Sequence, residues 1–116
     1  MNRTIKLEKY LLSNSVYLTG RPEGEDVRRI LKLDEEDKKK DEVIFQISKE
    51  ITGINVSFFL GLFSKSVKDL SEAEFREKYK FKYENKETEE LVKEDIMYGM
   101  NEALDIRKVE TNKKQK

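Results

Sequence analysis

The feature that most constrains the fold is an abrupt change from charged to apolar residues in the middle of the chain. The run Asp34–Glu42 contains no apolar residue, and Val43–Ile47 follows it as a nearly continuous apolar stretch of strand length. Such apolar runs are typical of a central strand covered on both faces, whereas charged runs are typical of solvated connectors. The sequence therefore predicts a sheet with a buried central strand next to an exposed connector.

The strongest helical pattern follows this strand. Apolar residues at 3.6-residue spacing predict an amphipathic helix over Ser57–Leu70. A second helix is expected to begin at Pro22, and a third after the capping box Ser71–Glu74. A fourth is expected over Lys86–Ile106, capped by Asn85. The stripe of the first helix consists of Val56, Phe59, Leu60, Phe63, Val67 and Leu70, widened by Phe58 and Leu62.

Short apolar stretches at the N-terminal end predict two or three further strands. Arg3–Leu7 alternates, and Tyr10–Leu12 and Val16–Leu18 are separated by residues with turn chemistry, which favours a hairpin. Phe81–Tyr83 also alternates. Strands that alternate with helices predict an α/β domain with a mixed four- to five-stranded sheet and about four helices. We expect this domain to span residues 1–106, followed by a basic, flexible tail over 107–116.

The composition excludes several kinds of site. Charged residues make up 41% of the chain, but six Phe and five Tyr argue for a folded core. The chain has neither Cys nor His, so zinc sites of the usual kind and Ser-His-Asp or Cys-His catalysis are excluded. We therefore expect no metal, no cofactor and no enzymatic activity. With no signal peptide or membrane-spanning run in the sequence, we expect a cytoplasmic protein.

The start of the predicted Ser57–Leu70 helix is the candidate functional site. Ser57 is placed as its N-cap or first residue, where a phosphate would face free backbone N–H groups. Ser57, Gly61 and Ser64 at i, i+4 and i+7 form a strip of small residues that a partner can approach closely. On spacing alone, ordinary capping and internal packing explain the same residues better than a docking site does. The candidate partner-binding or phosphorylation residues are Ser57, Asn55, Phe58, Gly61 and Ser64.

The residues Ile54-Asn55-Val56-Ser57-Phe58-Phe59 resemble a motif, I-[ST]-[PS]-S-F-[AL], that opens a helix in the bacterial STAS-like family. This family is related in fold to the anti-sigma factor antagonists. The resemblance covers residues 3–105 and includes Gly20-Arg21 before a helix. It departs at Gln46, where the family usually has an acidic residue, and at Val56, where it has Pro or Ser. The resemblance implies a STAS-like domain that binds an ATPase-type kinase or another signalling protein and is switched by phosphorylation of Ser57.

Two other functions stay open from the sequence. A small nucleotide-binding domain is one, although the chain has neither GxxxxGK[ST] nor GxGxxG. A nucleic-acid accessory protein that uses the basic tail is the other. Lys+Arg and Asp+Glu both number 24, and this balance favours protein binding over nucleic-acid binding. The basic excess is confined to Arg107, Lys108, Lys113, Lys114 and Lys116, which accompany a single Glu110.

Overall fold

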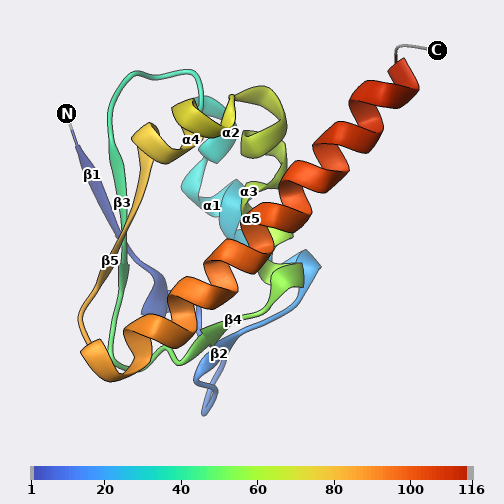
Figure 1. Cartoon of the computed structure of the whole chain (residues 1–116). Helices are drawn as coiled ribbons and strands as arrows, with labels where there is room; N and C mark the ends of the chain where they lie inside the picture. The colour runs from blue at the N-terminus through green and yellow to red at the C-terminus, as the bar shows by residue number, and fades with distance from the viewer. Residues whose placement is uncertain (1, 115–116) are drawn as a thin grey trace.

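The structure is a computed structural model that describes residues 2–114, with side chains described for residues 2–106. It has an α/β fold, and the described part contains five strands and five α-helices (Figure 1). Strands β1 (Arg3–Lys6), β3 (Val43–Ile47) and β5 (Tyr79–Tyr83) form one sheet in the order β1-β3-β5. Strands β2 (Tyr17–Leu18) and β4 (Gly53–Ile54) form a separate pair. The prediction of an α/β domain is confirmed. The prediction of a mixed sheet of four to five strands is wrong, because every pairing is parallel and the five strands are divided between a sheet of three and a pair.

The predicted N-terminal hairpin is absent. The chain turns after β1 into a short 3-10 helix, η1 (Leu7–Tyr10), which occupies the start of the expected Tyr10–Leu12 strand. Asn14 adopts a left-handed φ of 64° in the turn that follows. β2 then pairs with β4, 36 residues further along, because the carbonyl of Val16 accepts from Thr52 and that of Leu18 accepts from Asn55. The residues between Tyr10–Leu12 and Val16–Leu18 correctly predict a turn, but they do not predict which strand pairs with β2.

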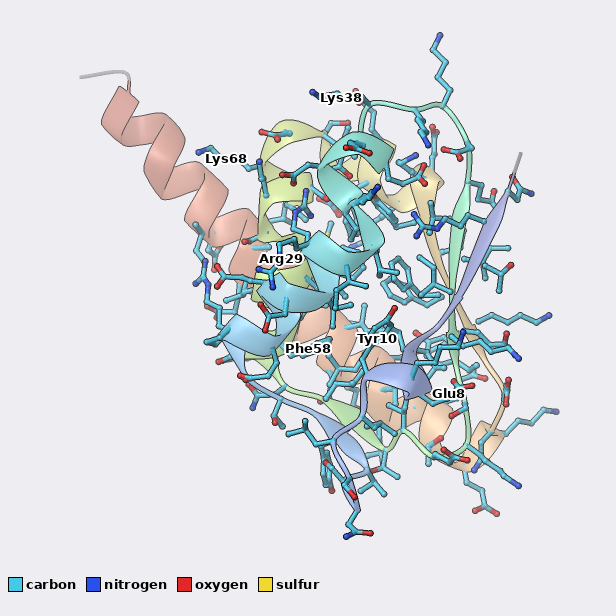
Figure 2. All side chains as sticks on the ribbon, turned by 180° about the vertical axis from the view of Figure 1, so that it is seen from behind. Glu8, Tyr10, Arg29, Lys38, Phe58 and Lys68 are labelled. Atoms are coloured by element: carbon cyan, nitrogen blue, oxygen red, sulfur yellow. The ribbon has the colours of Figure 1, made fainter. Side chains whose placement is uncertain are left out.

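The strand β3 is central, as predicted, but only one face of the sheet is covered. Figure 1 shows the helices gathered on one side of β1, β3 and β5. On that side β3 buries Val43, Phe45 and Ile47, whereas Ile44 and Gln46 face the other side and are half-buried. Figure 2 shows the polar side chains of the strands projecting away from the helices. The expectation of cover on both faces is therefore wrong. The open face also carries Thr4, Lys6, Lys80 and Lys82, all exposed.

The helices begin close to the predicted positions. Pro22 lies in the first turn of α1, and Ser71 accepts a hydrogen bond from the Glu74 N–H at the start of α4, as a capping residue should. On α1, Val27 and Leu31 face the core, whereas Ile30 is 60% exposed. The helices are α1 (Arg21–Leu31), α2 (Leu33–Glu36), α3 (Val56–Asp69), α4 (Glu72–Lys78) and α5 (Lys86–Lys114).

The core is organised around Phe63 of α3. Its ring lies 5.1 Å from those of Phe45 and Phe59 and 5.2 Å from that of Phe75, measured between centroids. The rings of Tyr79 and Phe81 lie within 6 Å as well. This cluster joins β3, α3, α4 and β5, so the predicted α3 stripe is confirmed as the core-facing side. Aromatic pairs at these separations add to the stabilisation that burial supplies.

The last helix is longer than predicted. Asn85 caps it as expected, since its side chain accepts from the Glu87 N–H at 2.9 Å. Val92, Met100 and Ala103 are buried and form the core-facing side of this helix. The helix continues past Ile106 to Lys114, so the backbone of the expected tail is helical that far. The basic side chains of that tail lie outside the described residues.

Candidate functional site

A buried group of charged and hydroxyl side chains surrounds Arg28 of α1. Its guanidinium donates to the carboxylate of Asp37 at 2.8 Å and to the Ser66 hydroxyl at 2.8 Å. The same guanidinium donates to the Leu62 carbonyl at 2.9 Å. Ser66 and Tyr79 both donate their hydroxyls to Asp37. Every member of this group therefore has a partner, as buried ions require.

A second ionic group lies beside the first, at Lys78. The Lys78 ammonium donates to Glu36 at 3.2 Å and to Asp41 at 3.0 Å, and Glu36 also accepts from Arg3 at 3.3 Å. Hydrogen bonding to Glu36 and the Lys78 ammonium hold the pKa of Asp41 at about 2. Glu36 is only 3% exposed. The expectation that Asp34–Glu42 is a fully solvated connector is therefore wrong, because Glu36 and Asp37 fasten it to α1, α3 and α4.

These two groups have the properties of a structural clamp. Ser66 is fully buried, so its hydroxyl is out of reach of a substrate. Burial and the neighbouring Asp37 carboxylate raise the pKa of Tyr79, which keeps its phenol protonated. Among the described residues, the only buried side-chain polar atom without a hydrogen bond is Glu8 Oε2, which belongs to neither group. Both groups are therefore explained by their role in holding the fold together.

The start of α3 lies at the opposite end of the helix from this clamp. Asn55 is the N-cap, and its side-chain oxygen accepts from the Ser57 N–H at 2.8 Å. Ser57 is the second helical residue, not the cap or the first residue as predicted, because the helix begins one residue earlier at Val56. Ser57 is half-buried. Its hydroxyl therefore stays near the surface, at the positive end of the helix dipole.

A hollow of about 460 Å³ opens beside this helix start. Two tyrosines contribute to its lining, Tyr17 from β2 and Tyr98 from α5, and they are 55% and 59% exposed. Asp95 of α5 reaches into the same place and accepts from the Ile54 N–H at 2.9 Å, which ties α5 to β4. We call the region the helix-start surface. It comprises Tyr17, Thr19, Ile54, Asn55, Val56, Asp95 and Tyr98, with Ser57 next to it in the chain.

The structure separates the five residues that the sequence proposed as a site. Asn55 and Ser57 lie at the helix-start surface. Phe58 is 1% exposed and belongs to the core, so it cannot contact a partner. Gly61 is buried where α1 crosses α3, and a methyl group on it would overlap the Arg21 carbonyl oxygen. Ser64 is half-buried and lines a different hollow, of about 270 Å³.

The predicted strip of small residues therefore does not form one docking surface. Its centre, Gly61, is filled by α1 of the same chain, because a glycine there lets the two helix backbones approach closely. This corrects the proposed roles of Gly61 and Phe58.

Sequence reasoning missed the side chains that surround the helix start. Tyr17 was assigned only to a short strand, and Tyr98 and Asp95 lie off the apolar stripe of the last helix. The available signal was the position of Leu91 and Tyr98, large residues seven apart on the polar side of that helix. Both prove to be more than half exposed. An exposed aromatic residue outside the core stripe is the kind of residue that marks an interaction site.

Within residues 2–106, no three acidic side chains gather closely enough to hold a metal ion. No helix in the described part of the chain has the length and apolar character needed to cross a membrane. Comparisons of the chain with models of protein families, with curated protein sequences and with solved structures gave no match.

Proposed function

We propose that the protein is a non-enzymatic regulatory module that binds another protein through the helix-start surface. The observation that carries the proposal is the pair of exposed tyrosines, Tyr17 and Tyr98, on the lining of one hollow. Tyrosine is enriched at protein interfaces because its ring supplies apolar area and its hydroxyl supplies a hydrogen bond. In a chain with 41% charged residues, this group of exposed aromatic side chains needs an explanation that folding does not supply.

Phosphorylation of Ser57 is the proposed switch. A phosphate would add nearly two negative charges beside Val56, which lines the hollow. The positive end of the α3 dipole would stabilise the phosphate, while its bulk and charge would block an approaching partner. The half-buried position of Ser57 at the second residue of α3 supports access by a kinase to its hydroxyl.

The resemblance to the STAS-like family supports the same proposal. It concerns the segment Ile54–Phe59, and in the structure this segment joins β4 to the capped start of α3. The partner class that the resemblance implies is an ATPase-type kinase or another signalling regulator. An α/β fold with a central strand before this helix is compatible with that proposal.

The test compares what wild-type and variant proteins retain from a lysate of the source organism. Tyr98→Ala and Ser57→Glu are expected to lose a partner that the wild type retains. Ile30→Ala, which removes an equally exposed apolar side chain from α1, is the matched control and is expected to retain it. Mass spectrometry then identifies the partner and detects phosphoserine on the bait.

Three outcomes would count against the proposal. One is a partner that both Tyr98→Ala and Ser57→Glu retain at full strength, which would place its binding site elsewhere. A second is loss of the partner in the Ile30→Ala control, which would mean that the effect is not local. A third is a saturable thermal shift with ATP or GTP that Tyr98→Ala abolishes, which would favour nucleotide binding at this hollow.

A further inference from the structure

A second surface, on the other side of α5, has different chemistry. β5 is an edge strand of the three-stranded sheet. The Glu84 N–H donates to the Ile47 carbonyl at 3.0 Å, so the even-numbered residues of this segment point their backbone groups toward β3. In a parallel ladder the intervening residues point theirs to the opposite edge. Within the described residues no partner meets the N–H or C=O groups of Phe81 there. The β5 edge therefore presents a free backbone donor and a free acceptor at Phe81.

An apolar groove runs beside this free edge. Its volume is about 600 Å³, and it lies between β5, α4 and α5. In Figure 1, α5 starts beside the end of β5 and diverges from it along its length. Met97 of α5 is 60% exposed, so the groove is open to solvent. The apolar and aromatic side chains in its lining include Phe75, Phe81, Tyr83, Ile96, Met97 and Met100.

The charged residues that line the groove are all basic. Its lining contains three basic residues, Arg76, Lys80 and Lys93, and no acidic residue. Arg76 and Lys93 each pair with a glutamate on their own helix, but Lys80 has no ion-pair partner among the described residues. Lys82 is exposed on the same face of β5 as Lys80. Because the whole chain has no net charge, this local excess favours an acidic ligand.

The sequence of β5 argues against a second copy of the chain as the occupant. Tyr79–Tyr83 reads YKFKY, which is the same in both directions. Antiparallel pairing of two copies about Phe81 would set Lys80 of each copy directly opposite Lys82 of the other. Like charges in directly opposed positions are destabilising, and lysines on edge strands are a common device against self-pairing.

We propose that the groove between β5 and α5 binds an extended segment of a partner protein, in which acidic and apolar residues alternate. The segment adds to the free edge of β5 as a fourth strand. Its acidic residues lie on the open face of the sheet next to Lys80 and Lys82, and its apolar residues enter the aromatic groove. Main-chain hydrogen bonds supply affinity and the alternate side chains supply specificity. This site is separate from the helix-start surface, since α5 contributes Met97 to one and Tyr98 to the other.

The first test uses a fluorescently labelled peptide of about eight residues, the length of an ordinary strand, in which Glu alternates with Val. A control peptide has the same residues in two blocks, so its charge and composition are identical. Fluorescence anisotropy with the full chain is expected to give saturable binding of the alternating peptide, with the block peptide at least about tenfold weaker. Equal binding of the two peptides, or binding of neither, would overturn the proposal.

Matched variants locate the site. Lys80→Glu is expected to weaken binding of the alternating peptide by about tenfold, because it replaces an attraction with a repulsion on the edge strand. Lys6→Glu makes the same change on the same open face but on β1, at the other edge, and is expected to bind as the wild type does. Equal weakening by both variants would mean that the peptide responds only to net charge, which contradicts the proposal.

Strand addition itself is tested by N-methylation of the peptide. Two peptides carry N-methyl groups at alternate residues, one at the odd and one at the even positions. One of them is expected to lose binding, because its methyl groups meet β5, and the other is expected to keep it. Similar affinities for both would exclude a strand ladder. Sedimentation of the free protein completes the test: a dimer strengthened by Lys80→Glu would mean that a second copy occupies the edge, and would overturn the proposal.

Discussion

Gly24 of α1 and Gly61 of α3 lie at the crossing of the two helices, each beneath the backbone of the other helix. A methyl group on Gly24 would overlap the carbonyl oxygen of Phe58 and lie 3.0 Å from the Leu62 nitrogen. One on Gly61 would overlap the carbonyl oxygen of Arg21 and lie 2.9 Å from the Glu25 nitrogen. In both cases the obstructing atoms belong to the backbone, so they cannot move away as the end of a flexible side chain can. The two glycines therefore set how closely α1 packs on α3.

Alanine at either glycine is expected to destabilise the fold by more than about 2 kcal/mol, because the helices must move apart. Ser64→Ala, one turn further along α3 on a half-buried side chain, is the control and is expected to change stability by less than about 0.5 kcal/mol. Urea denaturation followed by circular dichroism measures both. Gly61→Ala with wild-type stability would mean that α1 does not cross α3 at this point.

Two aspartates that bind the same arginine are expected to differ in their effect on stability. Asp37 and Asp34 both accept from Arg28, but the Asp37 side chain is 7% exposed and that of Asp34 is 59% exposed. Asp37→Ala leaves a buried guanidinium without its main partner and is expected to cost about 3–5 kcal/mol. Asp34→Ala removes a screened surface contact and is expected to cost less than about 1 kcal/mol. Equal losses in chemical denaturation would contradict the clamp.

The Asp41 carboxyl predicts a specific pH dependence. Its pKa in the folded protein is about 2, below its ordinary value of 3.8. The folded state therefore stabilises the ionised form of this carboxyl. Its contribution to stability is therefore complete above pH 3.8 and is lost as the pH falls to about 2. Asp41→Asn is expected to be less stable than the wild type at neutral pH, with a difference that shrinks across this range. A difference in the free energy of unfolding that stays constant down to pH 2 would refute the assignment.

The capping residue of α3 can be distinguished from its neighbour. Asn55→Ala removes the acceptor of the Ser57 N–H and is expected to cost about 1 kcal/mol. Ser57→Ala is expected to cost less, because the Ser57 side chain makes no hydrogen bond in the cap. Thermal unfolding of the two variants gives the order. A larger loss of stability for Ser57→Ala would mean that Ser57 is the capping residue. A phosphate on Ser57 would then lie in a different position relative to the start of the helix.

The features that the sequence predicted correctly depend on residues close to one another in the chain. The stripe that contains Phe59, Phe63 and Val67 repeats with the period of a helix, and Ser71 has its partner Glu74 three residues away. All the residues that make up such a pattern lie within one or two helical turns of one another. The core-facing side of α3 and the start of α4 could therefore be predicted without knowing the fold.

The features that the sequence did not predict depend on distant partners. Nothing near β2 indicates that it pairs with β4, and nothing near Asp37 indicates that Arg28, Ser66 and Tyr79 will surround it. A charged residue without a partner favours water, so the charged run Asp34–Glu42 predicts a solvent-exposed connector. The partners that make its burial favourable come from three separate elements, α1, α3 and β5. The same holds for Tyr17 and Tyr98, which line one hollow only because α5 packs against β4.

The uncovered face of the three-stranded sheet limits where a further structural element can pack. A second layer stacked on that face would have to dehydrate the ammonium groups of Lys6, Lys80 and Lys82, which are exposed in the described structure. Thickening into a sandwich is therefore unfavourable. Lateral extension is not opposed in the same way, because an added strand leaves these lysines in water. A further element is therefore favoured at an edge of the sheet, in the plane of the strands, and is opposed on the open face.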